Sequence, residues 1–182
     1  KPKMKALLIY PKWPKMPHQP KFHLPPHGPV CFPAALPDYV EVSFIDEHVQ
    51  TVNFSEECDI VFISCMLTCQ VPRGWEIAEI CRAAGKTVCM GGIAVNLHAE
   101  ESATHADSIL LGEAEGKMEK MLSDFRNNEL KPVYDHHCDF VDTALIKPAR
   151  RDILQRDLYN YRGVQMVDLI HETVSHARNL CD

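Results

Sequence analysis

Short apolar runs separated by helix-like segments are the feature that most restricts how this chain of 182 residues can fold. Four of the runs are continuous enough to be strands buried on both faces, as strands of a parallel sheet are. A fifth run alternates apolar and polar residues, which is typical of a strand nearer the edge of a sheet. The continuous runs are residues 6–10, 59–64, 87–90 and 108–111, and the alternating run is residues 41–45.

The segments between these runs include two with helical spacing, at residues 73–84 and 116–126. In the second, apolar side chains recur at i, i+3, i+4 and i+7, which indicates an amphipathic helix. Strands that alternate with helices predict an α/β fold: a doubly wound, five-stranded parallel sheet, flavodoxin-like or Rossmann-like, with helices on both faces. We expect the strand order 2-1-3-4-5 and at most one turn of helix across residues 47–58.

Two regions depart from this pattern. Residues 11–37 hold most of the prolines, which predicts a long loop followed by a short, irregular helix. From residue 127 onward the chain is polar and weakly periodic. We therefore expect an α/β domain over residues 1–126 and an irregular linker or C-terminal extension over residues 127–182. Within that extension, residues 162–170 are a candidate opening strand of a further domain.

Amino-acid composition limits which partners the protein can bind and in which cellular compartment it is expected. A net charge of −6 argues against nucleic acid as a partner, because its phosphates require clustered Lys and Arg. No apolar run approaches the roughly 18 residues of a membrane span, and no signal-peptide pattern opens the chain. The eight cysteines form no CxxC pair and several lie in apolar runs, which favours reduced, buried thiols and a cytoplasmic location.

Unusual residues follow the expected strands at their carboxyl ends, where open α/β sheets bind ligands. Paired glycines there leave room for a flat or elongated ligand, and a serine one strand over can donate a hydrogen bond into the same slot. Tight packing of strand against helix would also select glycine, so both explanations stay open. No GxGxxG follows the first strand, so we do not expect an ordinary dinucleotide site. The candidate ligand-binding residues are Tyr10, Pro11, Lys12, Trp13, Ser64, Cys65, Met66, Leu67, Thr68, Gly91, Gly92, Ile93, Ala94, Gly112, Glu113, Ala114 and Glu115.

The order and spacing of these segments resemble the cobalamin-binding domain that precedes the catalytic barrel of cobalamin-dependent radical S-adenosylmethionine enzymes. The resemblance implies that Ser64 and Gly91-Gly92 border the slot for the nucleotide tail of cobalamin. It also implies that residues 10–13, 65–68 and 112–115 surround the corrin ring, with Trp13, Met66 and Leu67 at its apolar edge and Thr68 near its amide groups. The matching segments are Pro26-His27-Gly28, Phe44-Ile45-Asp46-Glu47, residues 59–64, Met90-Gly91-Gly92, residues 111–115 and, resembling the connector to the radical domain, residues 148–154.

Histidine ligation of the cobalt is not expected. Many cobalamin-binding proteins carry DxHxxG after the first strand, where this chain has Pro11-Lys12-Trp13. His48 follows the second strand instead, and Thr51 stands where that motif requires glycine, so we expect His48 to be an exposed loop residue. Residues 136–139, with two histidines, a cysteine and an aspartate, are expected to form a polar loop, because adjacent residues converge poorly on one tetrahedral ion.

The resemblance further implies a catalytic barrel, in cis or in trans, that holds S-adenosylmethionine and an iron–sulfur cluster and performs methyl transfer or cyclisation. The chain itself shows no CxxxCxxC, and Cys181 has Ala177 where its cluster partner would stand. We therefore expect it not to perform radical chemistry alone. Two alternatives stay open: a non-enzymatic cobalamin sensor or carrier, and a cofactor-free scaffold that keeps the fold.

Overall fold

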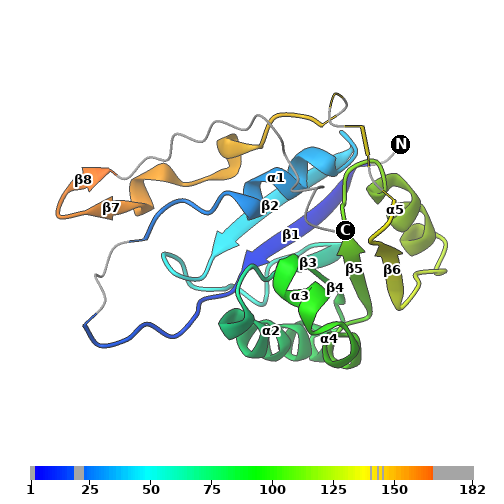
Figure 1. The fold of residues 1–182 in the computed structure, drawn as a ribbon, viewed down its shortest axis with the longest axis horizontal. Helices are drawn as coiled ribbons and strands as arrows, with labels where there is room; N and C mark the ends of the chain where they lie inside the picture. Colours follow the sequence, from blue (N-terminus) through cyan, green and yellow to red (C-terminus); the bar gives the residue numbers. More distant parts are fainter. Residues whose placement is uncertain (1–2, 19–22, 140, 143, 145, 166–182) are drawn as a thin grey trace.

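A parallel sheet of six strands forms the centre of the molecule, in the order β2-β1-β3-β4-β5-β6 (Figure 1). The computed structural model describes residues 3–18, 23–139, 141, 142, 144 and 146–165. The predicted α/β class is confirmed, and the five predicted strands lie in the expected order 2-1-3-4-5. They are β1 (Met4–Tyr10), β2 (Val40–Asp46), β3 (Ile60–Ser64), β4 (Thr87–Gly91) and β5 (Ser108–Gly112).

The expected number of five strands was wrong by one. A sixth strand, β6 (Val133–His136), pairs in parallel with β5, from Ile109 beside Val133 to Gly112 beside His136. The sheet therefore continues past residue 126, into the segment expected to be a linker. This edge strand is only four residues long, and of its side chains only Tyr134 is buried, so it lacks the apolar run that identifies an inner strand.

Helices cover both faces of the sheet, as predicted. On one face, α2 (Val71–Ala83), α3 (Ile93–Leu97) and α4 (Ala99–His105) pack over a core that includes Ile9, Ile63 and Met90. On the other, α1 (Gly28–Ala35) and α5 (Met118–Arg126) pack over Leu8, Phe62 and Cys89. Neighbouring residues of one strand thus serve opposite cores, because successive side chains of a strand point to opposite faces.

The predicted loop and short helix after β1 correspond to α1, which contains Pro33. The connection from β2 to β3 forms turns and holds no α-helix. No helix among the described residues is long and apolar enough to cross a membrane.

Beyond β6, the chain crosses back over the domain. The main-chain N–H of Arg150 donates to the carbonyl of Val30 in α1 at 2.8 Å. Two 3-10 turns, η3 (Arg151–Ile153) and η4 (Arg156–Leu158), precede a small antiparallel hairpin of β7 (Asn160–Tyr161) and β8 (Val164–Gln165). This hairpin covers the start of the strand expected at residues 162–170. The rest of that segment and Cys181 lie outside the described residues.

Candidate ligand-binding cavity

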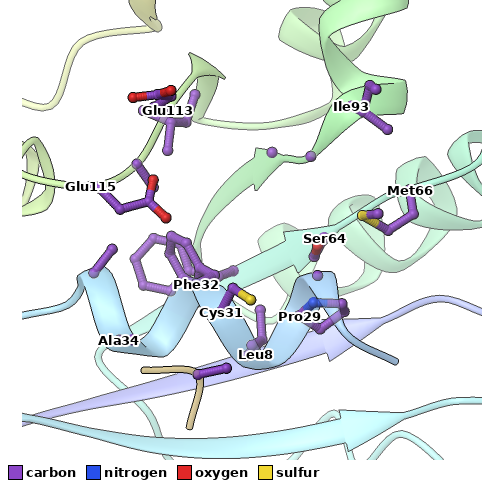
Figure 2. Close-up of a pocket in the computed structure, with 18 of the residues that line it drawn as sticks. Leu8, Pro29, Cys31, Phe32, Ala34, Ser64, Met66, Ile93, Glu113 and Glu115 are labelled. Atoms are coloured by element: carbon purple, nitrogen blue, oxygen red, sulfur yellow. The ribbon is translucent and has the colours of Figure 1, made fainter. Parts of the chain in front are cut away.

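A cavity of about 1120 Å³ opens at the carboxyl edge of the sheet, on the face covered by α1 and α5 (Figure 2). Its walls come from α1, from β3, β4 and β5 with the loop after β5, and from the segment after β6, here called the connector (Ala144, residues 146–149 and Arg151). Strand ends and the turns that follow them meet there, as expected for an open α/β sheet. Ten predicted residues line it: Tyr10, Ser64, Met66, Gly91, Gly92, Ile93, Gly112, Glu113, Ala114 and Glu115.

Seven predicted residues do not line this cavity: Pro11, Lys12, Trp13, Cys65, Leu67, Thr68 and Ala94. Cys65 and Ala94 are fully buried in the core on the opposite face of the sheet, where α2 and α3 pack. Leu67 and Thr68 lie at the surface, where η1 (Thr68–Gln70) begins. Lys12 and Trp13 belong to a polar cluster beside the cavity, described below.

Different physical reasons explain why glycine stands at positions 91 and 92. Gly92 has a φ of +100°, and a β-carbon there would lie 2.5 Å from the carbonyl oxygen of Cys65, so backbone geometry alone requires glycine. Gly91 has no such constraint, since its β-carbon would meet nothing closer than 3.6 Å, at the carbonyl oxygen of Leu110. Tight packing therefore explains Gly92 but not Gly91, whose missing side chain leaves the cavity open.

The cavity has an outer and an inner ring of strand residues. Tyr10, Ser64, Gly91 and Gly112 end their strands and form the outer ring. The residues two positions earlier on the same strands face the same side and form the inner ring, about 6.6 Å further in at 3.3 Å per residue. The inner ring consists of Leu8, Phe62, Cys89 and Leu110, all buried and all lining the cavity.

Two exposed side chains, Met66 and Ile93, and the partly buried Glu113 form the rim of the cavity. Ile93 and Glu113 lie across the opening from α1, whereas Met66 lies beside Gly28 at the start of that helix (Figure 2). The carboxylate of Glu113 accepts the main-chain N–H of Val141 at 2.9 Å, which holds the loop after β6 near the rim. Glu113 therefore orders a loop, which fits a structural role better than acid–base catalysis.

Asn96 of α3 joins two of the turns at this edge. Its Nδ2 donates to the carbonyl of Gly92 at 3.1 Å, and its Oδ1 accepts the main-chain N–H of Gly112 at 2.8 Å. Gln70 does the same for two other loops: its Nε2 donates to the carbonyl of Pro11 at 2.6 Å, and its Oε1 accepts the main-chain N–H groups of Met66 and Leu67. Neither residue was singled out in the sequence, because neither belongs to a motif.

The α1 and connector walls were also missed as parts of the site. Phe32, Ala34 and Cys31 of α1 line the cavity, as do Lys147 and Arg151 of the connector. The available signals were two segments matched to the cobalamin-binding domains: Pro26-His27-Gly28 at the start of this helix, and residues 148–154 of the connector. At Gly28 a β-carbon would lie 2.6 Å from Sδ of Met66, so the glycine lets α1 approach the loop after β3.

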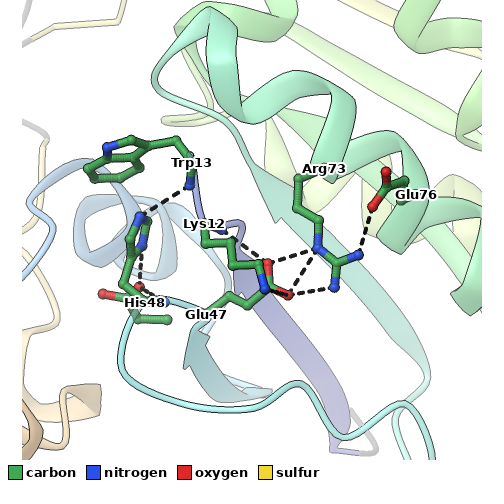
Figure 3. A network of polar contacts seen from close by, with 7 residues as sticks. Lys12, Trp13, Glu47, His48, Arg73 and Glu76 are labelled. Carbon is green, nitrogen blue, oxygen red and sulfur yellow. Dashed lines mark hydrogen bonds and ion pairs between the residues drawn. The ribbon is translucent and has the colours of Figure 1, made fainter. Parts of the chain in front are cut away.

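The polar cluster beside the cavity is centred on Glu47, just after β2 (Figure 3). Arg73 of α2 donates to both its carboxylate oxygens, with Nη2 at 2.5 Å from Oε1 and Nε at 3.1 Å from Oε2. The main-chain N–H of Lys12 also donates to Oε2, at 3.1 Å. Burial by itself would raise the pKa of Glu47, but these hydrogen bonds outweigh it and lower that pKa. The cluster thus anchors the loop after β1.

His48 is not the exposed loop histidine expected from the sequence, since its side chain is only 4% exposed. Its Nε2 accepts the main-chain N–H of Trp13 at 3.3 Å, and its Nδ1 donates to Oδ1 of Asp46 at 2.9 Å. From the far side, the hydroxyl of Tyr159 donates to Oδ2 of Asp46 at 3.1 Å. The Asp46 carboxylate therefore joins the end of β2 to both the loop after β1 and the connector.

His23, Asp46 and His48 bring possible metal-ligand atoms within 4.8 Å of one another. However, the two imidazole rings are stacked 4.0 Å apart at an interplanar angle of 9°. Their nitrogen lone pairs lie in separate parallel planes and cannot converge on one tetrahedral ion. Both nitrogens of His48 are also engaged already, so the cluster is better described as a hydrogen-bonded carboxylate than as a metal centre.

Comparison with known proteins gives two similar methyltransferases, and no family model matches the chain. The chain is 37% identical over 113 residues to bacteriochlorophyllide d C-8(2)-methyltransferase of Chlorobaculum tepidum, covering 62% of this chain and 25% of that protein. It is 30% identical over 99 residues to bacteriochlorophyllide d C-12(1)-methyltransferase of the same organism, covering 53% and 21%. The matched part thus spans a quarter or less of each of these relatives.

Proposed function

We propose that this chain is the cobalamin-binding module of a cobalamin-dependent radical S-adenosylmethionine methyltransferase. The observation that carries the proposal is Gly91: it lines a large cavity at the carboxyl edge of the sheet, and neither its backbone nor its packing requires glycine. Close approach of a ligand is the remaining reason for a missing side chain at that position. The similarity to two methyltransferases favours methyl transfer over cyclisation.

The residues present suit a large cofactor with an apolar body and a charged tail. The cavity volume of about 1120 Å³ exceeds the roughly 300–1,000 Å³ of ordinary small-molecule sites. Met66 and Ile93 offer apolar contacts at the rim, which suit the edge of a corrin ring. Lys147 and Arg151 line the cavity and could meet the phosphate of the nucleotide tail.

In this proposal, each part of the cavity has a distinct task. Ser64 and Gly91 border the nucleotide tail, while Met66, Ile93 and the turn at residues 112–115 lie against the corrin ring. The hydrogen bonds of Asn96 and Gln70 hold the surrounding loops in position. When bound, cobalamin supplies a methyl group for transfer, and S-adenosylmethionine with an iron–sulfur cluster would act from a barrel in cis or in trans.

Titration with hydroxocobalamin tests the proposal. The purified chain is expected to retain the corrin through gel filtration and to change its visible spectrum on binding. Gly91→Leu, which places a branched side chain in the cavity, should weaken binding at least about tenfold. Gly91→Ala adds a single β-carbon that makes only ordinary contacts with the protein, so any loss of cobalamin binding by this variant, smaller than that of Gly91→Leu, is due to the ligand and not to the fold.

A second variant guards against misfolding of Gly91→Leu. Cys31→Phe enlarges a partly exposed residue of α1 on the opposite wall of the cavity and should also weaken binding. A folded wild-type chain that retains no corrin would overturn the proposal and leave the cofactor-free scaffold. If cobalamin binds, a CxxxCxxC encoded downstream in the parent gene favours the radical enzyme, and its absence from that gene favours a non-enzymatic carrier.

A further inference from the structure

The inner ring of the cavity offers almost no hydrogen-bonding groups. Leu8, Phe62 and Leu110 are apolar, and Met121 of α5 adds a thioether to the same buried wall. The fourth strand residue, Cys89, has a thiol whose pKa is raised by burial, so it stays neutral and is a weak donor. Phe32 of α1 stands edge-on to Phe62 with ring centroids 4.9 Å apart, which makes this wall partly aromatic.

Polar side chains of the cavity lie further out, and most already have partners within the protein. Asn96 joins Gly92 to Gly112. The imidazole of His27 lies 3.2 Å from Nη2 of Arg151. Ser64 ends β3 in the outer ring, about 6.6 Å nearer the opening than Phe62. The cavity is thus polar near its opening and apolar inside.

We propose that this inner ring selects cobamides by their lower base, accepting a benzimidazole or phenol and discriminating against a purine. The inference rests on the proposed cobalamin-binding function and deepens it. With the sugar and phosphate of the tail near Ser64 and Gly91, the base at the end of the tail reaches the inner ring. Cobamides differ from one another mainly in that base, so this wall decides which of them bind.

Desolvation is the physical basis of the selection. Dimethylbenzimidazole is an apolar bicyclic ring that can pack against the partly exposed ring of Phe32. Adenine carries an exocyclic amine and additional ring nitrogens, each of which loses its hydrogen bonds to water on entering the cavity. Where the cavity wall offers no hydrogen-bond partner in place of water, each unpaired group weakens binding roughly five- to a hundredfold. We therefore expect the adeninyl cobamide to bind at least about tenfold more weakly than cobalamin.

Three cobamides, titrated against the wild-type chain, test the inference without any substitution. Cobalamin carries dimethylbenzimidazole, the adeninyl cobamide carries adenine, and cobinamide lacks the nucleotide tail. Cobalamin is expected to bind most tightly, with both others at least about tenfold weaker. Equal affinity for cobalamin and the adeninyl cobamide would overturn the inference while leaving the proposed function intact. Equal affinity for cobinamide would also overturn it, since the tail would then contribute nothing. Binding of none of the three refutes the proposed function itself.

Two substitutions on one helix locate the selectivity. Met121 and Met118 both lie on α5 and are 1% and 0% exposed, but only Met121 lines the cavity. Met121→Gln supplies an amide to the inner wall and should reduce the preference for cobalamin at least threefold. Met118→Gln buries the same amide elsewhere and should leave the preference unchanged.

The ratio of the two affinities, measured on each variant, separates a change in selectivity from a general loss of stability. A folded Met121→Gln chain with an unchanged ratio would overturn the inference. If Met121→Gln does not fold, Phe32→Tyr adds a hydroxyl to the same wall from a partly exposed position, and the same change in ratio is expected.

Discussion

The carbonyl oxygen of Cys65 occupies the place where a side chain on Gly92 would begin, at 2.5 Å from its β-carbon. Ala94 donates its main-chain N–H to the same oxygen at 3.1 Å, which starts α3 directly behind the glycine. The turn after β4 is therefore built from backbone contacts, and the fold alone requires glycine at position 92. Gly91, one residue earlier, is the position free to serve a ligand.

The two glycines should respond differently to alanine. Gly92→Ala forces an L-residue to a φ of +100° against backbone atoms, and we expect it to lower the free energy of unfolding by about 2 kcal/mol or more. Gly91→Ala should change it by less than about 1 kcal/mol. Urea denaturation of both variants measures the difference, and similar losses in the two would contradict the assignment.

Buried His48 should make stability depend on pH. Burial lowers its pKa below the ordinary value of 6.5, and the hydrogen bond to Asp46 only partly opposes that effect. The unfolded chain therefore takes up a proton at higher pH than the folded chain does. Stability from this group is complete above pH 6.5 and is lost as the pH falls below it.

The substitution His48→Asn keeps a donor near Oδ1 of Asp46 but cannot titrate, so it should flatten the dependence of unfolding free energy on pH below 6.5. The carboxylate of Asp46 affects folding stability over a separate, lower range of pH. Burial would raise its pKa, but contacts with His23 and His48 hold it at about 2. Its contribution, about 2 kcal/mol, is present above pH 3.8 and lost toward pH 2. A decline between pH 6.5 and pH 3.8 that persists in His48→Asn would assign the effect to another group.

Tyr159 should hold the connector against the domain. It is fully buried, and its hydroxyl reaches Asp46 across 113 positions of sequence. Tyr159→Phe removes only that hydroxyl and should cost about 1 kcal/mol, because Oδ2 of the buried carboxylate loses one of its two partners and keeps His23 Nε2 at 3.1 Å. Limited proteolysis should then cut residues 150–165 faster. Tyr161→Phe, in the partly exposed hairpin, is the control and should leave the cleavage rate unchanged.

The inner strands could be predicted because their signal is local. Residues 60–64 form a continuous apolar run, and burial on both faces leaves no other use for it. The edge strand β6 has no such run, since its place depends on pairing with β5 and on the hydrogen bond from Tyr134 to Asp124 at 2.8 Å. Contacts with residues elsewhere in the chain cannot be recognised from the four residues of β6 alone.

The residues of the candidate site also divide into those that local sequence patterns predict and those that depend on distant contacts. Ser64, Gly91 and Gly112 meet at one edge because parallel strands bring their carboxyl ends together, which strand positions alone predict. The side chain of Cys65 lies outside the cavity because alternation points it to the opposite core, one residue after Ser64. His48 is buried by contacts with His23 and Trp13. Both belong to a proline-rich loop without periodicity, so these contacts could not be predicted from the sequence.

Thiol reactivity gives a test of the two cores. Burial raises the pKa of Cys65 to about 12 and that of Cys81 to about 11, and Cys89 is shifted in the same direction. Because the thiolate is the reactive form, we expect these three to resist iodoacetamide until the chain unfolds. Cys69 and Cys138 are exposed and should react in the native state. Mass spectrometry of timed digests measures each rate, and rapid native labelling of Cys65 would contradict the packing.

Cys31 connects this measurement to the ligand. It lies on the cavity wall and is partly exposed, so its native labelling should be slower than that of Cys69 but measurable. Cobalamin in the cavity would cover it, and we expect saturating cobalamin to slow its alkylation at least about fivefold. Cys138 also lies at the surface but does not line the cavity, so its rate should not change. If cobalamin binds and Cys31 is not protected, the cofactor occupies another surface, because a ligand between α1 and the strand ends must shield this thiol.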